Sequence, residues 1–134
     1  MKTFKKSILV AAMALVSSYA FGADVKVALS GANEVPPVTT TATGDGTISI
    51  ADDGSVAGSV TTKGIQGTAA HIHMAAAGKN GPVIVPFTKD GDTYKAPAGA
   101  KLTPDQMTAY KAGELYVNVH SAANPGGEIR GQLK

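Results

Sequence analysis

The sequence contains no cysteine and no tryptophan, and only 5% of its residues are aromatic. The lack of cysteine excludes disulfide bonds, thiolate metal sites and cysteine nucleophiles, so packing and hydrogen bonds alone must stabilise the fold. Charged residues are also scarce, at 16%, and beyond the first six residues the sequence shows no cluster of Lys and Arg. Because binding to phosphates needs clustered positive charge, no nucleic-acid partner is expected.

The one long apolar run lies at the N-terminus and is typical of a secretory signal peptide. Three lysines precede the run, residues 7–16, and small residues follow where signal peptidase would cut, after Gly22 or after Ala20. The run is too short to cross a membrane, which takes about 20 residues. We therefore expect a signal peptide over residues 1–22, a mature chain with no membrane span, and a periplasmic or secreted location.

Removal of this segment changes the charge balance of the chain. Three of the twelve Lys and Arg residues lie in it, whereas all ten Asp and Glu residues follow it. Residues 23–134 therefore carry nine basic against ten acidic groups, a net charge near −1. This length suffices for one domain with a modest hydrophobic core.

The pattern of the mature chain predicts an all-β domain. Gly, Thr, Val, Ala and Ser dominate, and turn signals recur every ~8–12 residues, as in sandwiches and barrels. The continuous apolar run 82–87 predicts a strand covered on both faces. Strands are predicted over residues 25–29, 47–50, 55–62, 69–74, 82–87, 114–120 and 128–133.

One short helix is predicted near residues 103–112. Thr103 suits the N-cap, Pro104 suits the first helical position, and Gln106 completes a Thr-x-x-Gln capping box. The helix is expected to end before Gly113.

Two predicted strands carry all three histidines. His71 and His73 are two residues apart, so they share one face of their strand. In residues 114–120 the alternating apolar side chains must face the core, so His120 points to the opposite, outer face. If the two strands are neighbours, three imidazoles converge on one solvent-open patch.

Such a patch would suit a metal ion. Three neutral nitrogens without a thiolate favour Cu(II), with Zn(II) as the second choice. Tyr116, Asn118 and Arg130 are expected around the ion, where they would orient the rings or hold an anion or water. Met74 lies on the other face by alternation and is not expected to be a ligand.

Two charged residues far apart in the sequence are expected to pair. Glu34 lies in a proline-rich segment that cannot continue a central strand, and Arg130 offers a planar fork of donors to a carboxylate. We expect a Glu34–Arg130 pair to fasten the first loop to the last strand. Glu128 is given a structural role, because the sequence offers no paired acid for general-base catalysis.

Four segments together resemble the CHRD (chordin-like) domain in its bacterial exported form. They are LSGANEVPPV (29–38), GTAAHIHMAAAGKNGPVIVPF (67–87), LTPDQ (102–106) and AGELYVNVHSAANPGGEIRGQL (112–133), and they span essentially the whole mature chain, residues 23–134. The resemblance implies a Greek-key β-sandwich, immunoglobulin-like or superoxide-dismutase-like.

The histidine arrangement is also similar to the copper ligands of copper–zinc superoxide dismutases. This chain lacks their disulfide, their fourth copper histidine and their zinc cluster. Fold similarity does not carry function, so the likeness is an analogy. A copper-dependent redox enzyme remains a narrower variant, and no catalytic residue is assigned.

Two hypotheses follow for the mature domain. The first is an exported metal-binding module that holds copper at the three histidines. The alternative is a metal-free interaction domain whose histidine face contacts a protein partner in the cell envelope. A His-x-His pair alone is a weak metal signal, since histidines on strand faces are often only solvated.

Overall fold

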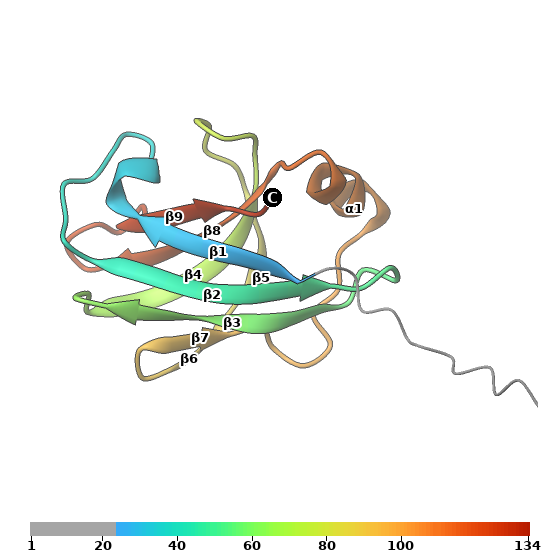
Figure 1. Ribbon diagram of the computed structural model, residues 1–134, viewed down its shortest axis with the longest axis horizontal. Coiled ribbons are helices and arrows are strands. Elements are labelled where there is room, and N and C mark those ends of the chain that lie inside the picture. Colours follow the sequence, from blue (N-terminus) through green and yellow to red (C-terminus); the bar gives the residue numbers. More distant parts are fainter. Residues whose placement is uncertain (1–23) are drawn as a thin grey trace, which may run out of the picture.

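The computed structural model describes residues 24–134, so the predicted signal peptide lies outside the described residues (Figure 1). Within them, nine antiparallel strands form one sheet in the order β5-β4-β8-β9-β1-β2-β3-β7-β6. The strands are β1 Val25–Ser30, β2 Thr43–Ile50, β3 Val56–Lys63, β4 Gly67–Met74, β5 Val83–Pro86, β6 Thr88–Asp90, β7 Thr93–Lys95, β8 Leu115–Ser121 and β9 Ile129–Gln132.

The sheet curls until its two edges nearly meet. The edge strands β5 and β6 are consecutive in the chain and are separated only by Phe87, whose backbone N–H donates to the carbonyl of Ala70 on β4 at 2.9 Å. The all-β class is therefore confirmed. The finer prediction of a Greek-key sandwich stays a prediction, because the strands hydrogen-bond into a single nearly closed sheet.

One hydrophobic core fills the inner face of the sheet. The alternation read from the sequence places apolar residues inward, and each of these contributes about 1.5–3 kcal/mol by leaving water. The side chains with no measurable exposure are Ile48, Val60, Ile72, Leu115, Val117, Val119, Ile129 and Leu133.

The helix α1, Pro104–Lys111, confirms the predicted capping box. Thr103 Oγ1 accepts from the backbone N–H of Gln106 at 3.2 Å, and Gln106 Oε1 accepts from the N–H of Thr103 at 2.9 Å. Gly113, at φ +75°, follows the C-cap. No helix among the described residues is long and apolar enough to cross a membrane.

The strand predicted over residues 82–87 forms, but the prediction that both of its faces are covered is wrong. β5 lies at a sheet edge, where Val83 is 49% exposed and only Val85 is buried. A continuous apolar run shows that the residues are hydrophobic, but it does not show whether the strand lies at the centre or at the edge of the sheet. The short strands β6 and β7, with a 3₁₀ turn at Gly31–Asn33, were not predicted.

Candidate metal centre

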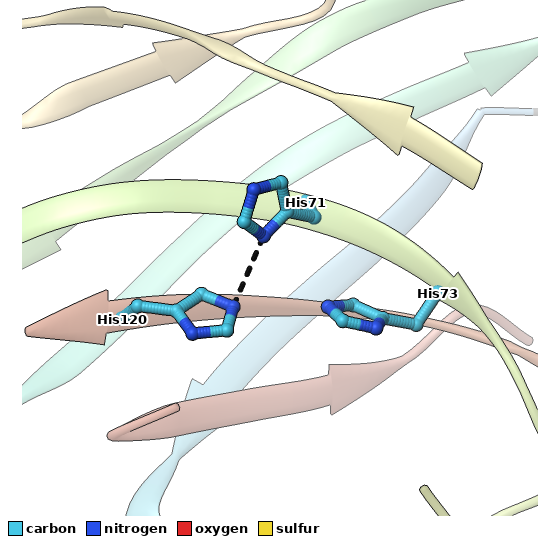
Figure 2. Close-up of side chains that lie close together, drawn as sticks. All are labelled: His71, His73 and His120. Carbon is cyan, nitrogen blue, oxygen red and sulfur yellow. Dashed lines mark hydrogen bonds between the residues drawn. The ribbon is translucent and has the colours of Figure 1, made fainter. Parts of the chain in front are cut away.

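The two histidine-bearing strands are neighbours, as the metal hypothesis requires. In the β4–β8 ladder His71 lies opposite Asn118, His73 lies opposite Tyr116, and His120 lies opposite Ala69, two residues before His71. The three imidazoles therefore emerge on one face of the sheet and meet beside it (Figure 2).

The three rings lie close enough to share one ion. His71 Nδ1 and His120 Nε2 are 3.0 Å apart, and one ring nitrogen from each histidine lies within 4.8 Å of the other two. Metal–nitrogen bonds of 2.0–2.1 Å place ligand nitrogens about 3–4 Å apart. The rings thus need to close by only about 1 Å to bind an ion.

Backbone carbonyls fix two of the rings in one tautomer. His73 Nδ1 donates to the carbonyl of Gly81 at 2.9 Å, and His120 Nδ1 donates to the carbonyl of Pro125 at 2.7 Å. A carbonyl only accepts, so Nδ1 carries the proton in both rings and each neutral ring keeps a lone pair on Nε2.

The Nε2 atom of His73 is buried and has no hydrogen-bond partner. Figure 2 shows this ring pointing a nitrogen at the space beside the other two histidines. An acceptor left unpaired in the interior costs about 1–3 kcal/mol. A cation at this point would bind the lone pair that the protein leaves free.

The surroundings keep the β4 histidines neutral. Burial lowers the pKa of His71, and the neighbouring His120 and His73 lower it further. Burial also lowers the pKa of His73, against the opposing effects of the Gly81 carbonyl and Asn118. Neutral imidazole is the form that binds metals.

The polar face of these strands is covered, which corrects the prediction of a solvent-open patch. His73 is 7% exposed, Tyr116 and Asn118 are each 1% exposed, and Arg130 is 3% exposed. The other two histidines, His71 and His120, are half-buried. The alternation of polar and apolar residues along a strand distinguishes its two faces, but it does not show that loops cover the polar face.

The three residues expected around the ion differ in their contacts. The ring of Tyr116 stacks on His73, with 4.8 Å between centroids and 3° between planes. Asn118 Nδ2 donates to the carbonyl of Gly126 at 3.4 Å, while its Oδ1 is buried without a partner. The guanidinium carbon of Arg130 lies 3.9 Å from the centroid of Tyr116, on whose ring it packs.

Glu34 and Arg130 form the expected ion pair. Arg130 Nε donates to Glu34 Oε1 at 2.9 Å, and both side chains are almost completely buried. Met74, expected to lie away from the ion, packs against the hydrophobic core.

Sequence reasoning missed the groups that orient the ligands. The Gly81 and Pro125 carbonyls belong to the loops 75–82 and 121–127, and a backbone acceptor leaves no signature in a sequence. Glu128, assigned only a structural role, proves to be the anchor of the second loop.

Comparison with known families gives one match. The family model of the CHRD domain matches residues 25–133, a span that includes all three histidines and the Glu34–Arg130 pair. No curated protein and no solved structure shows a match to the chain.

Proposed function

This chain belongs to the CHRD domain family, and we propose that it is an exported domain that binds a copper ion through His71, His73 and His120. The observation that carries the proposal is the buried, unpartnered Nε2 of His73, which lies in a cluster with the other two rings.

The metal-free alternative accounts for only part of this arrangement. A hydrogen bond between His71 and His120, 3.0 Å apart, pairs two of the rings, but it leaves the His73 lone pair without a donor. Three convergent imidazoles form a set that one cation satisfies and that a surface for protein contact does not need.

Copper is the ion that these ligands favour. The cluster offers three imidazoles, with no thiolate and no carboxylate in the group. For a given nitrogen set, Cu(II) binds more tightly than Zn(II) and the other divalent first-row ions. The half-buried His71 and His120 give the ion a route from solvent, which suits binding and exchange.

Export is the second part of the proposal. The basic start, the apolar run and the small residues before position 23 support a cleaved signal, and the first strand begins at Val25. The lack of cysteine means that the domain does not depend on disulfide formation outside the cytosol.

Titration of Cu(II) and Zn(II) into the domain, followed by melting temperature and absorbance, tests the copper proposal. A ligand that binds only the folded state stabilises it by about 2.7 kcal/mol at a hundredfold excess over the dissociation constant. We expect Cu(II) to give the larger shift and His73→Gln to remove most of it.

The matched control is Met74→Leu, on the same strand but packed against the core, which should retain the full shift. An equal shift in the wild type and in His73→Gln would favour the metal-free interaction domain, as would no shift with either ion.

A further inference from the structure

We propose that the two buried charged residues flanking Ile129 are separate positioning residues of this centre, Glu128 acting on His120 and Arg130 acting on His73. The inference rests on the proposed function, because it explains how the chain keeps the Nε2 atoms of two ligand rings unprotonated for an ion.

The two residues flank the first residue of the last strand, β9. Ile129 is fully buried in the core, so by alternation Arg130 points toward the polar face, while Glu128 directly precedes the strand and is also buried. They do not form a salt bridge with each other, since Arg130 pairs with Glu34. Each instead holds a different loop.

Glu128 anchors the loop 121–127. Its Oε1 accepts from Ser121 Oγ at 2.7 Å and from Asn124 Nδ2 at 3.2 Å, and its Oε2 accepts from Thr40 Oγ1 at 2.9 Å. Burial alone would raise the pKa of Glu128, but these three hydrogen bonds together hold it below its ordinary value. The ionised carboxylate is therefore an acceptor only.

The residue after Asn124 is Pro125, whose carbonyl accepts the Nδ1 proton of His120. Glu128 thus acts on His120 through one short, hydrogen-bonded turn. The carboxylate fixes the turn, the turn fixes the carbonyl, and the carbonyl fixes the tautomer in which Nε2 of His120 is unprotonated.

Arg130 anchors the loop 75–82 in the same manner. Its Nη1 donates to the carbonyl of Lys79 at 2.9 Å and its Nη2 donates to Asn80 Oδ1 at 2.5 Å. The next residue is Gly81, whose carbonyl accepts from His73 Nδ1 at 2.9 Å. The Gly81 N–H donates to the hydroxyl of Tyr116 at 3.2 Å, which fixes the turn further.

The two loops, one held by Glu128 and the other by Arg130, predict two separable effects. Loosening the loop 121–127 should free His120 to change tautomer and leave His73 as it was, whereas loosening the loop 75–82 should do the reverse. A merely structural role for the charged residues would disturb both rings together, in proportion to the loss of stability.

Imidazole ¹⁵N NMR of the metal-free protein tests this directly, because the sequence has only three histidines. We expect Glu128→Ala to convert the His120 signals from one pure tautomer to a mixture while His73 is unchanged. Glu128→Gln should restore the wild-type signals, since its amide still accepts from Ser121 and donates to Thr40 Oγ1.

Asn80→Ala tests the action of the loop 75–82 on His73. It is preferred to a substitution of Arg130, which would leave the buried Glu34 unpaired and could unfold the domain. Asn80 is exposed, so the variant should fold, and it should alter His73 and spare His120. In a parallel Cu(II) titration each alanine variant should lose about tenfold in affinity, the lower end of the effect of outer-shell partners.

Equal disturbance of both rings in either variant, or no change in either ring, would overturn the inference. Failure of the wild type to bind Cu(II) would instead refute the proposed function. The two failures are distinguishable, because the NMR spectra need no metal.

Discussion

The proposed metal site depends most on one atom, the buried and unpartnered Nε2 of His73. The pKa of His73 and of His71 is lowered in the fold from an ordinary value of 6.5, chiefly by burial. Below pH 6.5 these two histidines are protonated in the unfolded chain but remain neutral in the folded chain until the pH reaches their lowered pKa. The free energy of unfolding therefore falls as the pH falls from 6.5 to the lowered values, and levels off below them.

We predict that the melting temperature of the metal-free protein decreases between about pH 7.5 and about pH 5, and that His73→Gln makes this decrease smaller. Met74→Leu, a substitution of a residue packed against the core, should keep the wild-type slope. A slope unaffected by His73→Gln would show that the buried ring does not resist protonation.

Tyr116 is predicted to stabilise the centre in two separable ways. Tyr116→Phe keeps the stack on His73 but leaves the Gly81 N–H unpaired, at a cost of about 1 kcal/mol. Tyr116→Leu also loses the contacts of the ring with His73 and Arg130, for a total of about 2–3 kcal/mol. Urea unfolding measures both, and equal losses would contradict the role of the stack.

At the scale of single residues, the sequence located the three clustered histidines but not the orientation of their rings. Alternation along two strands was enough to put His71, His73 and His120 on one face. The tautomers depend on the carbonyls of Gly81 and Pro125, and the positions of those carbonyls are set by loops whose conformation no local pattern encodes.

Among the elements, the loops 75–82 and 121–127 turn a polar strand face into a buried layer. Tight packing under the second loop is visible at Gly127, which has φ +123° and where a Cβ would clash with Glu34 Oε2 and Asn118 Nδ2. Its neighbour Gly126 has open space around the same position.

We therefore predict that Gly127→Ala destabilises the domain by about 2 kcal/mol or more, through strain and steric conflict. Gly126→Ala, the matched control, should change the free energy of unfolding by less than about 0.5 kcal/mol. Chemical denaturation of the two variants gives the comparison. Similar stability in both would mean that the loop does not pack against Glu34 as the structure shows.

The elements that sequence patterns predicted well are those with strong local signals. The capping box defined α1, and apolar alternation defined β1, β4, β8 and β9 to within one or two residues. β2 begins at Thr43 rather than at residue 47, because Gly44 and Gly46 hide the start of the strand. β6 has only exposed residues, so no hydrophobic pattern marks it.

For the whole molecule, the near-closure of the sheet depends on pairings far apart in the sequence. β1 lies between β9 and β2, and the edges meet where β5 passes into β6 through Phe87. Composition and turn spacing predicted an all-β domain, but they give no information on the order of the strands in the sheet. That is why the class could be read from the sequence while the closure of the sheet could not.

The proposal that the protein is exported predicts that its signal peptide is cleaved. When the full chain is expressed in a bacterium, N-terminal sequencing of the product should find cleavage after Gly22 or after Ala20, with the product outside the cytosol. Replacing Lys2, Lys5 and Lys6 by neutral residues should slow this processing. An uncut chain that stays in the cytosol would contradict the proposal.

The central claim, that three imidazoles hold one copper ion, is tested most directly by a crystal structure of the domain soaked with Cu(II), with anomalous data at the copper edge. The account predicts one anomalous peak about 2.0–2.2 Å from His73 Nε2 and from a ring nitrogen of each of His71 and His120. A fully soaked crystal with no peak between the three rings, or with copper only elsewhere on the surface, would contradict it.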